Sequence, residues 1–169
     1  MKNGRCKEYK NGELIFDGYY LNDKRWNGKR KESDYNDNLI FEGEYVNNKK
    51  KGKYKKYNEN RELRSEGEYL YDFKYKGKEY IKGKLVYEGN YLYDKKYTGK
   101  SYDENGNIIY ELIKGNGKVI EYSNNNKTFD GELLNGKKNG RYKGILIFDG
   151  EYLNEIKNGK CKEYSNYGE

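Results

Sequence analysis

Apolar and polar residues alternate along most of the chain, as in β-strands that bury one face. Leu14, Phe16, Gly18 and Tyr20 would point to one side of such a strand, and the residues between them to the other. The strand-like segments are rich in Tyr, Phe, Ile and Leu, which favour β-structure. Between them stand residue pairs that accept positive φ and close two-residue hairpins: Asn11-Gly12, Asn105-Gly106, Asn125-Asn126 and Asn135-Gly136. The pattern predicts an all-β fold, a continuous antiparallel meander of about 14 to 16 short strands.

A short sequence unit recurs along the chain, which indicates a repeat protein. An aromatic residue, an acid and a glycine mark each unit: Phe16-Asp17-Gly18, Phe41-Glu42-Gly43, Tyr87-Glu88-Gly89, Phe129-Asp130-Gly131 and Phe148-Asp149-Gly150, with eroded copies at residues 65–67 and 110–112. A second glycine followed by a base completes the unit, and seven full periods fit between Gly4 and Gly159. Both ends fall in the same phase of the repeat. We therefore expect residues 1–169 to form a single array of about seven repeats, excised from a longer chain.

The spacing of the glycines predicts the register of the hairpins. Gly43 and Gly52 are nine residues apart, and their midpoint falls between Asn47 and Asn48, where a two-residue turn is expected. The same symmetry predicts three cross-strand ion pairs: Glu42 with Lys53, Asp130 with Arg141, and Asp149 with Lys160. Three other units have a spacing of ten and an extra aromatic residue, which is interpreted as a β-bulge: Trp26, Tyr75 and Tyr97.

The repeated hairpins need a shared core. A single hairpin is marginal in water, so the units are expected to stack and bury their aromatic residues against their neighbours. The result would be a single elongated, solenoid-like sheet. Its predicted aromatic face consists of Phe16, Tyr20, Phe41, Tyr45, Tyr69, Tyr87, Tyr91, Phe129, Phe148 and Tyr152.

The repeat resembles a known family. Units such as Phe41-Glu42-Gly43-Glu44-Tyr45-Val46-Asn47-Asn48-Lys49, followed by Gly52-Lys53, are similar to the MORN repeat and its MORN-variant relatives. The family pattern is aromatic-x-Gly-x-aromatic, a short turn, then Gly-x-Gly, and the resemblance extends from Gly4 to Tyr164. The last glycine is replaced in every unit, for example by Tyr54 and Ser101. The resemblance implies a MORN-like solenoid that mediates protein contacts without catalysis. Such modules are often attached to cytoskeletal or membrane-associated proteins, and acidic phospholipid binding is proposed for some members.

The composition limits the chemistry that the chain can perform. The 169 residues include 22 Tyr but no His, which removes imidazole acid–base catalysis, His-activated nucleophiles and the commonest transition-metal ligand. We therefore expect no enzyme activity, no cofactor and no metal. Cys6 and Cys161 occupy equivalent positions far apart in the array, which predicts two reduced thiols in a cytoplasmic protein. The longest apolar run, Ile145–Phe148, is far too short to span a membrane.

The net charge of +7 lies entirely in the first half, where residues 1–84 hold 22 basic and 15 acidic side chains. A+T-rich coding DNA would also produce an excess of Lys. Two clusters at equivalent repeat positions are predicted to merge into one basic edge near the hairpin tips: Lys24, Arg25, Lys29, Arg30, Lys31, Lys49, Lys50, Lys51, Lys53, Lys55 and Lys56. One interpretation is a solvated edge that opposes aggregation, and the other is a surface for an anionic partner.

The first functional hypothesis is a non-catalytic scaffold that binds a partner protein through its concave face or the basic edge. The alternative is recruitment to an anionic membrane surface through the same edge. Nucleic acid is not expected, because no recognised module accompanies the interleaved Tyr and Lys. Glycan or choline recognition generally needs several Trp, and Trp26 is the only one. Unpaired terminal strands predict self-association.

Overall fold

The structure is a computed structural model that describes residues 1–123, 126–143, 148–153 and 156–163. Within these ranges the chain forms fifteen strands and no helix. The strands are β1 (Gly4–Lys10), β2 (Glu13–Leu21), β3 (Lys24–Ser33), β4 (Leu39–Val46), β5 (Lys49–Tyr57), β6 (Leu63–Leu70), β7 (Phe73–Ile81), β8 (Lys84–Leu92), β9 (Lys95–Tyr102), β10 (Ile108–Ile113), β11 (Asn116–Ser123), β12 (Asn126–Leu134), β13 (Lys137–Lys143), β14 (Phe148–Leu153) and β15 (Ile156–Glu163). The predicted fold class, an all-β antiparallel meander of hairpins, is confirmed.

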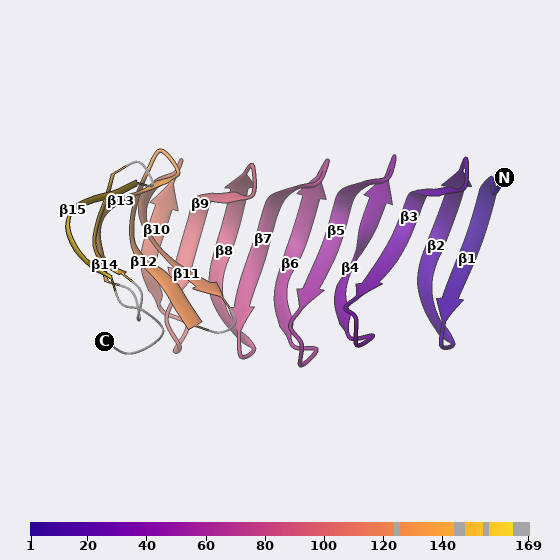
Figure 1. The fold of residues 1–169 in the computed structure, drawn as a ribbon, viewed down its shortest axis with the longest axis horizontal. Coiled ribbons are helices and arrows are strands. Elements are labelled where there is room, and N and C mark those ends of the chain that lie inside the picture. The colour runs from indigo at the N-terminus through magenta and orange to yellow at the C-terminus, as the bar shows by residue number, and fades with distance from the viewer. Residues whose placement is uncertain (124–125, 144–147, 154–155, 164–169) are drawn as a thin grey trace. The chain divides into compact units, whose positions relative to one another are not determined.

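The strands belong to two compact units. The first comprises residues 1–83 together with 92–94, and the second comprises residues 84–91 together with 95–169. In the first unit β1 to β7 lie side by side in chain order (Figure 1), each antiparallel to the next. In the second unit the strands also follow chain order. That residues 1–169 form one repeat array stays a prediction.

Two-residue turns close the hairpins along the upper edge of the first unit in Figure 1. Both residues of the β4–β5 turn have positive φ, 53° at Asn47 and 58° at Asn48, which matches the twist of the flanking strands. The predicted turns at residues 11–12, 47–48 and 135–136 are therefore confirmed. The turn predicted at residues 125–126 begins at a residue outside the described ranges.

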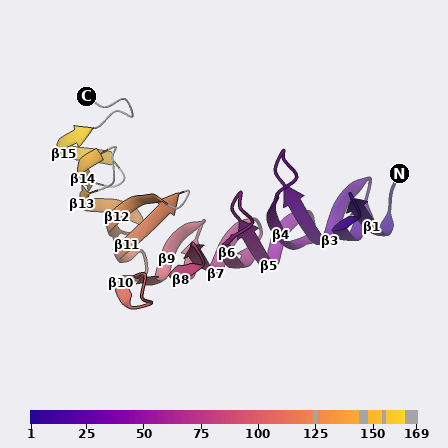
Figure 2. The ribbon, with the colours of Figure 1, turned by 90° about the horizontal axis from the view of Figure 1, so that it is seen from below.

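Five-residue loops replace two-residue turns at several of the connections between strands. The predicted turn Asn105-Gly106 is wrong, because it lies inside such a loop, from Asp103 to Asn107. The Oδ1 atom of Asp103 accepts hydrogen bonds from the backbone N–H groups of Asn105 at 2.9 Å and Asn107 at 2.8 Å. Asp34 and Asn58 begin equivalent loops, which project from the same side of the first unit (Figure 2). These acceptors compete for backbone donors that a hairpin ladder would otherwise use.

Two of the three β-bulges predicted from extra aromatic residues, those at Trp26 and Tyr75, are present, and the one at Tyr97 stays a prediction. Tyr19 pairs with Asn27 and Tyr20 with Arg25, so Trp26 is the additional residue in β3. Glu68 pairs with Lys76 and Tyr69 with Lys74, which makes Tyr75 the additional residue in β7. Each bulge lets the two glycines of its hairpin meet, as Gly18 and Gly28 do.

The predicted ion-pair register is wrong where it can be compared. Glu42 lies opposite Lys55 instead of Lys53, and Asp149 lies opposite Lys162 instead of Lys160. The reason is a register shift between Gly43 and Tyr45, where β5 carries extra residues that include Gly52 at φ +97°. The pair Asp130 with Arg141 stays a prediction.

Facing glycines lie beneath the aromatic rings of the core. A Cβ atom on Gly18 would be 2.7 Å from the Cα of Gly28 and 2.8 Å from the ring of Phe16, closer than atoms can approach. The ring of Phe16 occupies the space that side chains would fill and is only 1 % exposed. The recurrent glycine is therefore the residue that leaves room for the aromatic ring beside the facing strand.

Hydrogen bonds also connect each hairpin tip to the preceding hairpin of the first unit. The N–H of Asn48 donates to the carbonyl of Trp26 at 2.7 Å, and the N–H of Asp72 donates to the carbonyl of Lys50 at 2.9 Å. In return the N–H of Lys50 donates to Oδ1 of Asp72 at 2.7 Å. The upper turns thus form a ladder that fixes neighbouring hairpins relative to one another.

Candidate functional site

The predicted aromatic face is the core of the sheet. Its buried members are Phe16, Phe41, Tyr45, Tyr69, Tyr87, Tyr91 and Phe129, and Tyr20 is half-buried. The side chains of Phe148 and Tyr152 lie outside the described residues. In one cluster the ring of Phe41 stacks on that of Tyr54 with centroids 6.2 Å apart, and the Tyr69 ring lies 4.5 Å from Tyr54. These rings form the interior and leave little aromatic surface for a partner.

Basic side chains cover the rings of this core in a repeating arrangement. The base stands nine residues after the aromatic residue of its unit. The cation-to-ring distances are 5.3 Å for Arg25 over Phe16, 3.9 Å for Lys50 over Phe41, 4.2 Å for Lys96 over Tyr87 and 4.4 Å for Lys138 over Phe129. Lys96 is only 8 % exposed, and its ammonium donates to the carbonyl of Ile120 at 3.1 Å. Cation–π attraction therefore holds these bases inside the fold.

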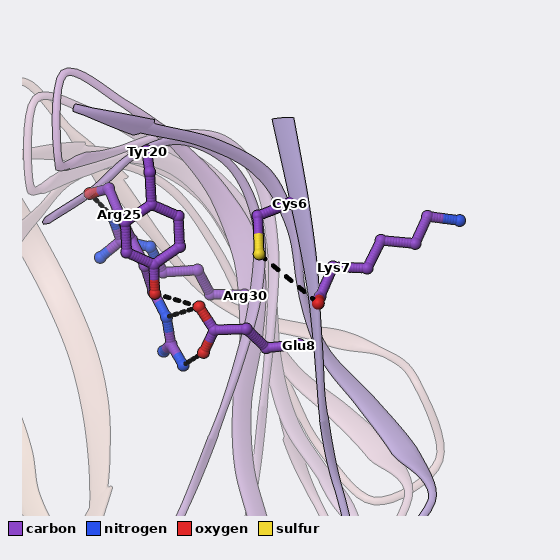
Figure 3. A network of polar contacts seen from close by, with 6 residues as sticks. All are labelled: Cys6, Lys7, Glu8, Tyr20, Arg25 and Arg30. Carbon is purple, nitrogen blue, oxygen red and sulfur yellow. Dashed lines mark hydrogen bonds and ion pairs between the residues drawn. The ribbon is translucent and has the colours of Figure 1, made fainter. Parts of the chain in front are cut away.

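A carboxylate completes the arrangement, as Figure 3 shows for the first repeat. The phenol of Tyr20 and the guanidinium of Arg25 both donate to the carboxylate of Glu8, while Lys7 points away. The hydrogen bond from Arg25 lowers the pKa of Glu8, and the same contact raises the pKa of Arg25. Both side chains are thus held in their charged forms.

The second repeat contains the same elements around Lys50. Its ammonium lies 3.4 Å from the carboxylate of Glu32, which also accepts a hydrogen bond from the phenol of Tyr45. Burial is the main reason that the pKa of Tyr45 is raised, and this hydrogen bond adds to it. Arg30 lies 4.0 Å from the Tyr45 ring and donates to Oδ1 of Asn48 at 2.8 Å. Its burial lowers the pKa of Arg30.

The structure distributes the eleven predicted basic-edge residues over more than one surface. Four face the rings of the core: Arg25, Arg30, Lys50 and Lys56. Lys51 lies at an upper turn, 4.8 Å from the ring of Tyr71. The other six follow the alternation to the opposite face: Lys24, Lys29, Lys31, Lys49, Lys53 and Lys55. They do not form one edge, and their role in binding stays a prediction.

Charges alternate from strand to strand on this outer face. Lys31 of β3 lies opposite Glu42 of β4, which lies opposite Lys55 of β5. Lys55 in turn lies opposite Glu66 of β6, and Glu66 opposite Lys78 of β7. Bases and acids therefore screen one another across the middle of the face. An anionic surface would meet a carboxylate between each pair of neighbouring ammonium groups there.

Large apolar side chains gather where the outer face meets the upper turns. Six residues from two neighbouring hairpins form this exposed group, which we name the apolar turn cluster: Leu70, Tyr71, Phe73, Tyr75, Leu92 and Tyr93. Their exposed fractions range from 45 % for Leu70 to 72 % for Tyr93. Leu70 pairs with Phe73 across the hairpin, and the rings of Phe73 and Tyr93 meet edge to face with centroids 5.6 Å apart. The cluster is therefore continuous over both hairpins.

Two tyrosines of the cluster occupy strained turn positions. Tyr71 has φ 49° and Tyr93 has φ 49°, at the turn positions that Asn22 and Asn47 take in the preceding hairpins. Positive φ is uncommon for bulky side chains, whereas Asn accepts it readily. Tyr71 is 51 % and Tyr93 72 % exposed, so their contacts with Lys51 and with the Phe73 ring leave much of each ring open to a partner. Strained residues of this kind often mark functional sites.

Three residues that stand where the MORN pattern has its last glycine lie in the core of the sheet. Tyr54 is 4 % exposed, Ser101 2 % and Val119 0 %, so their side chains point into the core. Sequence reasoning did not place them there. The alternation within each strand was the available signal, because Tyr54 lies directly opposite Gly43 of the aromatic unit.

Two further features bear on the class of site. Among the described residues, no group of three or more Cys, Asp or Glu side chains is arranged to hold a metal ion. The same part of the chain contains no helix long and apolar enough to cross a membrane. The described side chains provide exposed surfaces, ion pairs and aromatic rings as the possible means of contact with another molecule.

Comparisons with known proteins do not assign the chain to a family. No family model and no curated protein matches the chain.

Proposed function

We propose that the protein is a non-catalytic scaffold that binds a partner protein through the apolar turn cluster. The observation that carries the proposal is the pair of exposed tyrosines, Tyr71 and Tyr93, at turn positions with positive φ. Replacement by Asn would relieve the strain, so their presence is best explained by a role outside the fold. The resemblance to MORN repeats supports the same class of function.

The chemistry of the cluster suits a protein interface. Tyrosine and phenylalanine are enriched at interfaces because they bury a large area with few rotatable bonds. Leu70, Phe73 and Leu92 supply adjoining apolar surface, and each is close to half exposed. The turn ladder keeps the two hairpins in place, so binding would order few additional groups.

Recruitment to an anionic membrane is the alternative function, and one observation favours it. Among the described residues, Lys24, Lys49 and Lys51 form no ion pair, and Lys24 and Lys51 lie beside the exposed side chains of Leu21 and Tyr71. Such a combination also suits a lipid headgroup region. The alternating charges on the rest of the outer face oppose it.

The double variant Tyr71→Asn with Tyr93→Asn tests the scaffold. We expect it to fold at least as stably as the wild type and to lose the proteins that the wild-type chain captures from a lysate of its own source. Tyr35→Asn is the matched control, because Tyr35 is 94 % exposed but lies in a loop outside the cluster. Equal capture by the double variant and the wild type would refute the proposal. Co-sedimentation with phosphatidylserine vesicles that the double variant weakens would favour the membrane alternative.

A further inference from the structure

We propose that Asn11 is a site of spontaneous modification, at which the turn between β1 and β2 deamidates to a mixture of isoaspartate and aspartate. This reaction changes the covalent structure of the chain itself and does not depend on the proposed scaffold function. Asn-Gly pairs recur through the repeats. Their hydrogen bonds differ from pair to pair, and this difference selects Asn11.

Deamidation needs an asparagine side chain, the backbone nitrogen that follows it, and water. Hydroxide removes the N–H proton of Gly12, and the nitrogen attacks the Cγ atom of Asn11. A C–N bond forms to give a cyclic succinimide, and the side-chain amide takes a proton from water and leaves as ammonia. Water then opens the ring at either carbonyl, which gives aspartate or isoaspartate without oxidation or reduction. Glycine favours the reaction because it has no Cβ atom to hinder the attacking nitrogen.

In three Asn-Gly pairs the asparagine side chain is held by a backbone hydrogen bond. The donor in each case is the first residue of a two-residue turn further along the chain. Rotation of the side chain toward its own backbone would break this bond. The bonds run from the N–H of Asn22 to Oδ1 of Asn3 at 2.9 Å, from the N–H of Asn47 to Oδ1 of Asn27 at 2.7 Å, and from the N–H of Asn135 to Oδ1 of Asn116 at 3.0 Å.

In two other pairs the attacking nitrogen is engaged instead. The N–H of Gly106 donates to the carbonyl of Asp103 at 3.2 Å inside its loop, and the N–H of Gly136 donates to the carbonyl of Gly115 at 2.8 Å. Each nitrogen must give up its acceptor before it can attack. Deamidation should therefore be slowed at these pairs by the free energy of one backbone hydrogen bond.

Neither reacting group is engaged at Asn11-Gly12. This turn lies at the opposite end of the strands from the upper turns, away from the turn ladder (Figure 1). Both residues are exposed, and among the described residues neither the Asn11 side chain nor the Gly12 N–H makes a hydrogen bond. A Cβ atom on Gly12 would meet no atom within 4 Å, so this side of the turn is open to water.

The pair Asn135-Gly136 provides a matched comparison within the same molecule. The φ angles are 50° at Asn11 and 80° at Gly12, and they are 52° at Asn135 and 75° at Gly136. The two turns thus share their residues and their φ angles. They differ in the hydrogen bonds of the turn ladder, which the second pair makes and the first does not. A difference in rate between them therefore reports these hydrogen bonds.

Peptide mapping by mass spectrometry tests the proposal on the full chain. The protein is incubated in mildly alkaline buffer, sampled over time and digested, and isoaspartate is detected by methylation with an isoaspartyl methyltransferase. Product should accumulate at Asn11 about fivefold to tenfold faster than at Asn135, the factor that one backbone hydrogen bond corresponds to. In concentrated urea the two sites should react at similar rates, because the dipeptide is the same.

The variant Asn11→Gly supplies a second readout, because Gly-Gly also closes a two-residue hairpin but carries no side-chain amide. It should abolish the earliest release of ammonia and the earliest methylation while leaving the circular dichroism spectrum unchanged. Equal rates at Asn11 and Asn135 in the folded protein, or a faster reaction at Asn105, would overturn the proposal. So would a difference between Asn11 and Asn135 that persists in urea, because it would arise from the local sequence.

Discussion

The interaction between Lys50 and Phe41 can be measured separately from every other contact of either residue. The ammonium lies 3.9 Å from the ring centroid, and the Lys50 side chain is 25 % exposed. A partly desolvated cation–π contact is worth about 1 kcal/mol. Lys50→Met also removes the 3.4 Å ion pair with Glu32, and Phe41→Leu also removes ring contacts with Tyr45 and Tyr54. A double-mutant cycle subtracts these additional losses.

The assay is urea unfolding followed by circular dichroism for the wild type, both single variants and the double variant. We expect Phe41→Leu to cost about 1 to 1.5 kcal/mol and the coupling between the two positions to be about 1 kcal/mol. Phe41→Leu with Lys55→Met is the control cycle, because Lys55 lies on the outer face opposite Glu42. A Phe41–Lys50 coupling below about 0.3 kcal/mol, equal to that of the control, would refute the idea that bases stabilise the core through the rings.

Three further predictions concern the glycines, the phenols and the loops. Gly67→Ala should destabilise the fold by about 1 to 3 kcal/mol in urea unfolding, since its Cβ would lie 2.1 Å from a carbonyl oxygen of the facing strand; an unchanged midpoint would contradict this close approach. Burial raises the pKa of Tyr69 to about 12, and a hydrogen bond to a glutamate raises the pKa of Tyr102 to about 12. The stabilising contribution of these two phenols should be complete below pH 10 and lost as the pH rises through 12. Phenolate absorbance and the unfolded fraction should therefore rise together near pH 12. Titration of all tyrosines near pH 10 with the fold intact would contradict the raised pKa values. Hydrogen bonds lower the pKa of Asp103, so the contribution of this carboxylate to stability should be lost only as the pH falls through the lowered value. Asp103→Asn should keep the loop and remove that acid dependence, because Asn58 accepts the equivalent bonds at 3.0 and 2.9 Å in its own loop. Asp103→Ala should destabilise the loop at neutral pH.

The periodicity of the sequence was sufficient to predict the strands, several turns and the bulges at Trp26 and Tyr75. Alternation and Asn-rich turns are local signals, and the additional residues at Trp26 and Tyr75 appear directly in the glycine spacing. The ion pairs were misplaced because Gly52 adopts a bulged conformation, which glycine spacing alone does not reveal. A single bulge of this kind shifts the register of every cross-strand residue pair that follows it along the hairpin.

The candidate site was less accessible to sequence reasoning. Lys and Arg were assigned to a solvated edge because they are charged, yet their long apolar stems let Arg25 and Lys50 cover rings. The constant interval of nine residues between ring and base was a usable signal. Tyr71 and Tyr93 were missed because turn rules favour Asn and Gly at positive φ. A bulky residue at such a position is recognised only after the turn has been located.

The hydrogen bonds between successive upper turns have a consequence for how such a chain can change in length. Each bond joins a tip to a backbone group 21 or 22 residues earlier, so the smallest interchangeable element is a complete hairpin. Loss of one strand would send every later tip to the opposite side and leave its donors without acceptors. Gene duplications or deletions would therefore be retained only in steps of two strands, and natural variants of this protein should differ in length by whole hairpins.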